Sequence, residues 1–231
     1  MTLRGTPGDE LWCTRLRTEI AGDVAATGVA GLSVNVRDAT VAASLMTLTT
    51  LDPPVIALVS IWTDRYYGPE IDAVTEILGS ECEELAAYLV TESVPLAPPL
   101  TVAGERTPGL ANVALLRRPD DLDEATWLRR WHREHTQVAI DTQATFGYTQ
   151  NTVVRALTDG AAPVSAIVEE LFPLAAVTDL HAFFGAADDG DLADRMTRML
   201  ASTSAFGADT NVDTVPTSRY VLKEPFVTLQ P

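Results

Sequence analysis

Side chains able to do acid–base chemistry gather in the second half of the 231-residue sequence. Trp131, His132 and His135 lie in WLRRWHREH, where apolar residues recur at helical spacing. On a helical wheel His135 falls within the apolar arc, so its imidazole is expected to point into the protein, neutral and suited to relay a proton near pH 7. His135 is therefore a candidate catalytic residue. The alternative is a core histidine that hydrogen-bonds a backbone carbonyl.

Two consecutive acidic residues, Glu169 and Glu170, lie in SAIVEELF, which has the length and composition of a strand. Successive strand side chains point to opposite faces, so one carboxylate must face the helices and the other the interior. A carboxylate against an apolar cavity has a raised pKa and is a candidate acid or base. We therefore treat both as candidate catalytic residues, with the alternative that both remain in water.

The strand GYTQN and the helix before it supply the candidate ligand-binding residues. Asn151 ends this strand and Asn35 ends the similar GLSVN, so each is a candidate to hydrogen-bond a ligand or to stabilise a strand end. His132 lies at the border of the apolar arc and is expected at the surface or at a cavity mouth. The full ligand-binding set is Trp131, His132, Tyr148 and Asn151.

The composition excludes several classes of partner. With 32 acidic and 16 basic residues the formal net charge is −16, which repels nucleic acid and anionic membranes. The apolar run VIALVSIW is far shorter than the roughly 20 residues of a membrane helix. The two cysteines lack metal-ligand spacing, and there is no nucleotide or metalloprotease motif, so no cofactor or metal is predicted. We expect a cytoplasmic protein.

The two halves repeat one another in order. The apolar stripe of the helix near residues 12–24 matches that near 127–139, and GLSVN matches GYTQN. VIALVSIW is matched with SAIVEELF, a helix over 71–84 with one over 191–204, and YLVTES with YVLKEP. The last match pairs Glu92 with Glu224, which we interpret as a structural pair. The strand GLANVALLRR opens the second half, so the order is the βαββαβ of a ferredoxin-like unit.

We therefore predict an α+β fold of two tandem ferredoxin-like repeats, over residues 1–97 and 109–231, joined by a proline-rich linker over 98–108. Each repeat covers one sheet face with helices, so the bare faces are expected to pack together into an internal barrel. Such a chain is a monomer with an internal pseudo-dimer, and pairing into a homodimer stays open.

The opening strand of the first repeat is predicted to be short. Only Met1 to Leu3 are left to match GLANVALLRR. Either the first sheet lacks a full strand or the natural start lies upstream, and we favour the upstream start because an unpaired sheet edge promotes aggregation.

The stretch NVALLRRPDDLDEATWLRRWHREHTQVA resembles the opening of domains of the EthD-like family, in the dimeric α/β-barrel superfamily. The family motif W-x3-H falls on Trp131 and His135. The resemblance implies a barrel that binds a small hydrophobic or aromatic, polyketide-like compound, acted on by a cofactor-independent oxygenase, cyclase or decarboxylase. Two alternatives stay open: a non-catalytic small-molecule-binding or pathway accessory protein, and a haem-binding protein.

Overall fold

The strand order shows how the two halves of the chain are related. In the computed structural model, which describes residues 1–225, nine strands run in the order β4-β1-β3-β2-β9-β6-β8-β7-β5, each antiparallel to its neighbours. The runs β4-β1-β3-β2 and β9-β6-β8-β7 have the same order, which is that of the ferredoxin-like unit. The strands are β1 (Thr2–Arg4), β2 (Gly31–Val36), β3 (Val55–Trp62), β4 (Glu84–Ala86), β5 (Tyr88–Leu96), β6 (Leu110–Leu116), β7 (Gly147–Ala156), β8 (Ala166–Phe172) and β9 (Asp213–Lys223).

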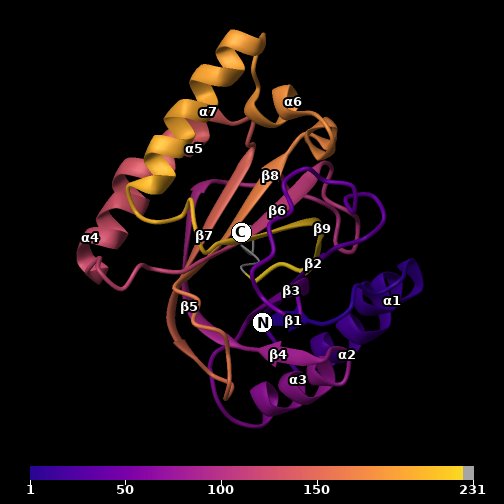
Figure 1. The fold of residues 1–231 in the computed structure, drawn as a ribbon. Coiled ribbons are helices and arrows are strands. Elements are labelled where there is room, and N and C mark those ends of the chain that lie inside the picture. The colour runs from indigo at the N-terminus through magenta and orange to yellow at the C-terminus, as the bar shows by residue number, and fades with distance from the viewer. Residues whose placement is uncertain (226–231) are drawn as a thin grey trace, which may run out of the picture.

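Helices cover only the outer side of each unit. Figure 1 shows α1, α2 and α3 at the lower right and α4, α5 and α7 at the upper left, with the strands between the two groups. In both halves the first helix is continuous but contains a π-helical turn, at Leu16–Ile20 and at Arg130–His135. The helices are α1 (Glu10–Arg15), α2 (Ala21–Ala26), α3 (Pro69–Gly79), α4 (Glu124–Arg129), α5 (Thr136–Thr142), α6 (Leu180–Phe184) and α7 (Asp189–Ser204), with a 3-10 turn at Leu174–Val177.

Local sequence explains where these helices begin and end. Asp9 and Asp123 accept hydrogen bonds from the backbone N–H three residues on, so both long helices start at an aspartate cap. The second helix of the first half ends at Gly79, earlier than the expected 84, because Glu84 already belongs to β4. Within residues 1–225 no helix is both long and apolar enough to cross a membrane.

The closing strands join the two halves and turn their bare faces inward. The first part of β9 pairs with β6 and the second part with β2. On the other side β4 pairs with β1 and β5 with β7, and only Ala87 separates β4 from β5. The enclosed core is apolar and comes from both halves; its buried members are Val55, Leu58, Val113, Leu115, Val164, Ile167 and Val215. The predicted packing of bare sheet faces is confirmed.

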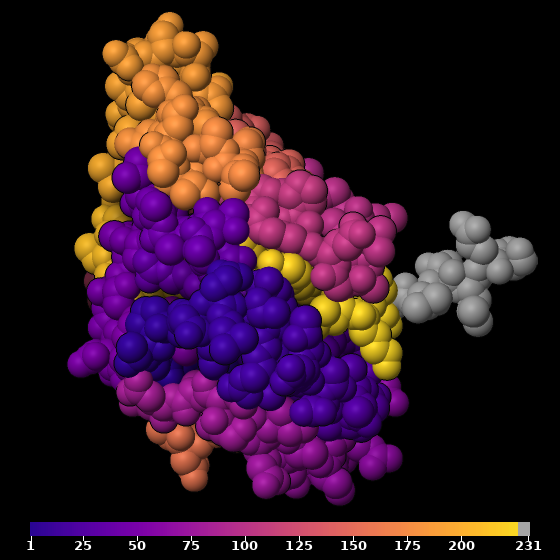
Figure 2. All heavy atoms as spheres, turned by 90° about the vertical axis from the view of Figure 1, so that its right-hand side faces the viewer, coloured from indigo at the N-terminus to yellow at the C-terminus, as the bar shows by residue number. Residues whose placement is uncertain are grey.

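The segment between the halves lies against the last strand. Gly104 N–H donates to Val221 O and Thr107 N–H to Arg219 O, both at 2.8 Å. Figure 2 shows this part of the chain, near residue 100 in magenta, beside the yellow end of β9. The segment therefore covers β9 where that strand leaves β6.

Strand register corrects the sequence matching of VIALVSIW with SAIVEELF. Asn35 lies opposite Leu58, and Asn151, at the same place in the second half, lies opposite Ile167. Leu58 is therefore equivalent to Ile167, whereas the sequence matching was one residue out of step. With this register the residue equivalent to Glu169 is Ser60. The correction matters because a one-residue shift exchanges the two faces of a strand.

The closing strands need a similar correction. Glu92 lies opposite Asn151, and Arg219 lies opposite the equivalent Asn35. Glu92 and Arg219 are therefore equivalent, and the match of Glu92 with Glu224 was wrong. The tyrosines misled the comparison because they lie on opposite faces. Tyr88 packs on the core between the half-sheets, and Tyr220 packs on the helix side.

The first strand is short, as predicted. β1 has three residues and β6 has seven. The part that β1 and β6 have in common is followed in each half by an arginine that pairs with the closing strand. Arg4 forms an ion pair of 2.6 Å with Glu84, and Arg117 forms one of 2.6 Å with Asp213. Burial opposes ionisation of Asp213, but hydrogen bonds from Thr50 and Leu51 and the Arg117 guanidinium outweigh it and lower the pKa of this carboxyl.

The ion pairs of these two equivalent arginines make a matched stability test. In the Arg117–Asp213 pair the side chains are 8% and 2% exposed, whereas Glu84 is 51% exposed. Asp213→Ala is expected to lower the free energy of unfolding by about 3–5 kcal/mol because it leaves a buried charge unpaired. Glu84→Ala is expected to lower it by no more than about 1 kcal/mol, because Glu84 is half in water and Arg4, although only 7% exposed, keeps its hydrogen bonds to the Asp52 and Pro53 carbonyls. Urea denaturation at neutral pH measures both, and equal losses would contradict the role given to burial.

Candidate functional site

The structure separates the candidate residues by sheet face. Trp131 and His135 come from the helix over the second unit, and Tyr148 and Glu170 point from the strands toward that helix layer. Asn151 and Glu169 point the other way, into the space between the half-sheets. Two distinct places therefore qualify as sites: a polar cluster under the second-half helices and an interior cavity.

Glu170 is the central residue of the polar cluster. Its side chain is buried, and among residues 1–225 it has no hydrogen-bond partner within 3.5 Å. Burial raises the pKa of its carboxyl to about 8. Asn112 on β6 and Tyr148 on β7 lie directly opposite it in the neighbouring strands. The Asn112 Oδ1 atom is fully buried without a partner among the described residues, so a protonated Glu170 faces an acceptor that needs a donor.

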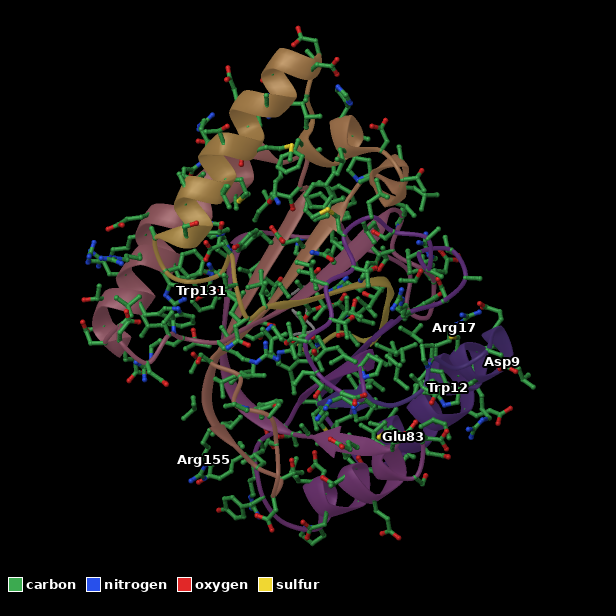
Figure 3. The ribbon with its side chains drawn as sticks, in the orientation of Figure 1. Asp9, Trp12, Arg17, Glu83, Trp131 and Arg155 are labelled. Atoms are coloured by element: carbon green, nitrogen blue, oxygen red, sulfur yellow. The ribbon has the colours of Figure 1, made fainter. Side chains whose placement is uncertain are left out.

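Two hydrogen-bond donors border this carboxyl. Burial, with an added effect of the Glu170 charge, raises the pKa of Tyr148, so its hydroxyl keeps its proton. Trp131 is fully buried, and its Nε1–H lies near the Tyr148 hydroxyl oxygen without a regular hydrogen bond to it or to any other described residue. Figure 3 shows Trp131 where the second-half helices meet the strands. A buried group without a partner is costly, and such groups occur at sites that bind a ligand or carry out chemistry.

His135 lies beside the cluster, under α7. Its Nδ1 atom is 2.9 Å from the Ser202 hydroxyl, and its ring centroid is 4.8 Å from that of Phe206. Burial lowers the pKa of His135 to about 4, so the ring is neutral at pH 7. The expectation that it works on a ligand inside the barrel is corrected, because side chains of the helix layer reach only the outer face of the sheet.

His132 lies at the edge of the cluster, with its ring centroid 4.2 Å from that of Trp131. Its Nε2 atom is 3.4 Å from the Thr152 hydroxyl, and burial lowers its pKa. It also borders a surface depression with Leu128 and Arg133. The side chain is half-buried there, and a role in ligand binding stays a prediction.

The π-helical turn belongs to the fold, since both halves have it. In the second half Thr136 donates to the Trp131 carbonyl at 3.0 Å and accepts from Gln150 at 2.8 Å. π-helical turns often occur at functional sites. Because this turn is present in both halves, it does not by itself mark a site in the second half. The difference between the halves lies in the side chains around the turn.

Helix α7 covers the cluster without burying itself. None of its sixteen residues is buried. It is held by the His135–Ser202 contact and by Arg195, which donates to the Asp141 carbonyl at 3.2 Å and the Phe184 carbonyl at 3.0 Å. An element with few buried contacts opens at low free-energy cost. Helix α7 is thus the most loosely packed long helix of this unit.

The interior carboxylate is bound within the protein. Glu169 Oε2 accepts from Asn35 Nδ2 at 2.7 Å, and both side chains are buried. This bond ties β8 of one half to β2 of the other. The geometry favours a structural role for Glu169.

An interior cavity of about 230 Å³ lies at the equivalent place in the other half. Asn151 lines it, and Ser60 there replaces the longer Glu169. Glu92 lies at its open end, where partial burial and the Glu169 charge raise its pKa. The cavity is lined by Met1, Leu58, Ser60, Ile61, Trp62, Thr63, Tyr66, Ile71, Tyr88, Leu89, Val90, Glu92, Asn151, Leu157 and Ile167.

Sequence reasoning missed Asn112, Ser202 and Glu92. Asn112 had a signal, because it is the only polar residue within the apolar strand sequence LANVALL. A polar side chain inside a buried strand needs a partner and so marks a site. Ser202 and Glu92 had none, since their neighbours come from distant parts of the chain.

Comparisons with known proteins bear on the fold. No protein-family model and no curated protein matches the sequence. The structure is similar to the crystal structure of an anthrone oxidase-like protein, with a TM-score of 0.55 and 12% identity over 99% of this chain and 94% of that one. The chain has a dimeric α/β-barrel-like fold. A proposed monooxygenase from Lactobacillus acidophilus NCFM also aligns, with a TM-score of 0.47 and 9% identity over 96% of this chain and 94% of that one. Membership of the EthD-like family stays a prediction.

The two halves of this dimeric α/β-barrel-like fold differ at the cluster. The residues equivalent to Tyr148 and Glu170 are Leu32 and Ile61, as the shared register shows. Ile20 holds the place of His135 in the matched helices. The fold therefore forms with apolar residues at these places, and the polar set of the second half is not needed for folding.

The raised pKa of Glu170 predicts a pH-dependent stability difference. The native state holds a proton that an ordinary carboxyl, with a pKa of 4.5, releases on unfolding. Holding this proton contributes to the free energy of unfolding. The contribution is complete below pH 4.5 and is lost as the pH rises to about 8. Glu170→Gln cannot ionise and is expected to avoid this loss of stability, so near pH 9 the variant is more stable than the wild type by about 5 kcal/mol.

Urea denaturation of both proteins at pH 5, 7 and 9 measures this difference. The lowered pKa of His135 affects both proteins equally and cancels. A stability difference that does not change with pH would contradict the burial of an ionisable Glu170.

Proposed function

We propose that the chain is an enzyme that binds a small, flat, largely apolar compound between strands β6, β8 and β7 and the helices above them, and that Glu170 transfers a proton to or from it. The observation that carries the proposal is the buried Glu170 carboxyl, which has a pKa of about 8 and no hydrogen-bond partner among the described residues. An acid or base works best when its pKa lies near the working pH.

The groups around Glu170 suit a carbonyl or phenolic compound. The Trp131 Nε1–H and the Tyr148 hydroxyl donate hydrogen bonds to an oxygen that becomes negatively charged when a nearby C–H loses its proton. Asn112 offers a further polar contact. The side chains packed around these groups are apolar and include Ala114, Trp127, Val168 and Phe206. Burial away from water strengthens each of these polar contacts.

The compound enters through movement of α7. This helix has no buried residue, so parting it from the sheet exposes little core. The His135–Ser202 contact closes the cover, which gives His135 a positioning role at the edge of the site.

The similarity to an anthrone oxidase-like protein suggests one concrete reaction. Glu170 takes a proton from a CH2 group next to an aromatic ketone, and the resulting enolate reacts with dioxygen. The carbon loses two hydrogens and gains one oxygen atom as a new carbonyl, and the other oxygen atom leaves as water. Proton transfer is also the step that cyclisation and decarboxylation would share.

Anthrone is the probe for this proposal. The wild type is expected to convert anthrone to anthraquinone above the spontaneous rate, with one dioxygen consumed per product, as followed by absorbance and an oxygen electrode. Glu170→Gln is expected to reduce the rate by about 10²-fold or more, because it removes the proton-transferring group.

Glu169→Gln is the matched control, since it changes the next residue on the opposite face of the same strand and keeps an acceptor for Asn35. It is expected to retain activity within a few-fold. Thermal unfolding of all three proteins shows that each is folded. A wild type that binds anthrone, by quenching of tryptophan emission, but never converts it would be a binding protein. One that neither binds nor converts it would overturn the oxidase reaction.

A further inference from the structure

The two halves differ in charge where the first long helix meets the strand that follows it. In the first half the Arg17 guanidinium lies 3.3 Å from Glu10 and 4.0 Å from Asp38, so its charge is balanced within the protein. Asp38 is buried and also accepts a hydrogen bond of 2.9 Å from the Ser218 hydroxyl. The first half therefore supplies its own carboxylate at this corner.

The second half has no carboxylate at the equivalent strand position. In the first half the Arg37 N–H donates to the Ile56 carbonyl at 3.1 Å. In the second half the Val153 N–H makes the same bond to the Ser165 carbonyl, at 3.0 Å, so the two strands are still in step here. The next position holds the buried carboxylate in the first half and Val154 in the second. The Val154 side chain is 56% exposed, which is unusual for a large apolar residue of a strand.

The equivalent part of the helix remains basic. His132 holds the place of Arg17, because each lies three residues before the matched pair His135 and Ile20. The next residue, Arg133, is exposed, and its guanidinium forms no ion pair or hydrogen bond within residues 1–225. The second half thus keeps a cation at this corner and lacks the carboxylate that balances it in the first.

A groove opens at the same corner. Beyond their last shared hydrogen bond, β7 and the segment 161–165 bound a depression of about 330 Å³ beside the start of α4. A second depression, of about 310 Å³, continues along the helix, and Leu128 lines both. Thr152 lines the first and His132 the second, with 3.4 Å between the hydroxyl and the ring nitrogen. The two depressions therefore form one groove between the helix and β7.

This groove is basic in an acidic protein. Of the 16 basic and 32 acidic residues of the chain, four arginines and one glutamate line it: Arg118, Arg129, Arg133, Arg155 and Glu124. Arg129 is paired with Glu134, which leaves Arg133 as the free charge at the helix end. A cleft lined by one sign of charge concentrates its field, so an anion that the rest of the surface repels is attracted here.

We propose that the groove binds an organic anion, an apolar compound that ends in a carboxylate, and that this carboxylate takes the place that Asp38 fills in the first half. The Arg133 guanidinium and the Thr152 hydroxyl donate hydrogen bonds to it, and a planar guanidinium fits a carboxylate with two parallel bonds. The apolar body lies against the other lining side chains, which include Trp127, Leu128, Val154 and Val164.

The groove is separate from the site around Glu170. Asn112, Tyr148 and Trp131, which border Glu170, do not line the groove. This inference therefore goes beyond the proposed enzyme function and does not depend on it.

The compound 2-naphthoate is the probe, and the uncharged 2-naphthamide is its match in shape. Isothermal titration calorimetry with the full chain at pH 7 measures both affinities. We expect saturable binding of 2-naphthoate, at least tenfold tighter than that of the amide, and an affinity that falls as sodium chloride is added. Equal affinities, or no binding of 2-naphthoate at millimolar concentration, would overturn the proposal.

Two substitutions of one exposed residue locate the carboxylate. Val154→Asp and Val154→Asn introduce side chains of nearly the same shape, but only the aspartate places a negative charge where the carboxylate of the ligand is proposed to lie. Val154→Asp is expected to bind 2-naphthoate at least tenfold more weakly than Val154→Asn, because like charges repel. The same affinity in both variants would place the anion elsewhere and contradict the proposal.

A pair of arginine variants tests the cation. Arg133→Gln is expected to weaken 2-naphthoate binding at least fivefold and to leave 2-naphthamide binding unchanged. Arg198→Gln, at an exposed position of α7 outside the groove, removes the same charge and is expected to change neither affinity. Glu170→Gln is expected to bind 2-naphthoate as the wild type does. Equal effects of the two arginine variants, or loss of binding in Glu170→Gln, would show that the compound binds outside the groove.

Discussion

The structure depends on the long closing strands, which pair with both halves at once. β9 satisfies β6 with its first residues and β2 with its last, and β4 with β5 does the same for β1 and β7. A ferredoxin-like sheet alone would leave one apolar face in water. Sharing the closing strands places these faces against each other and buries a core drawn from both halves. The Asn35–Glu169 bond adds a polar tie across the same interface.

This arrangement gives each strand residue one of two environments, and that division organises the chemistry. Side chains on the outer face meet helices, and those on the inner face meet the other half of the barrel. Glu169 and Glu170 are neighbours in sequence, yet one is hydrogen-bonded between the halves and the other is isolated under α5 and α7. For the same reason His135 and Asn151 cannot act on one ligand. The acid–base groups and the interior cavity belong to different sites.

The duplication makes the departures from symmetry informative. Where the first half has Leu32 and Ile61, the second has Tyr148 and Glu170, so the second half carries a desolvation cost that the fold does not require. The first half departs in another way, because its opening strand is too short to fill the place that β6 fills in the second. One departure adds polar groups to a packed layer and the other leaves a gap in the sheet.

The sequence by itself determined most of the elements, their order and the repeat, because helical and alternating periodicity are local properties of the chain, but it missed the short β4 and α6. It also placed His135 on the buried side of its helix and showed that the first strand is short. The sequence did not determine the strand register. VIALVSIW and SAIVEELF can be aligned equally well in two ways that differ by one residue, and only hydrogen bonding to a neighbouring strand decides which alignment is right. The sequence did not determine the pKa of Glu170 either, since the pKa of a carboxyl depends on its burial by residues that are distant in sequence. Only the tertiary structure decides which face a strand residue occupies, and here the face determines the chemistry.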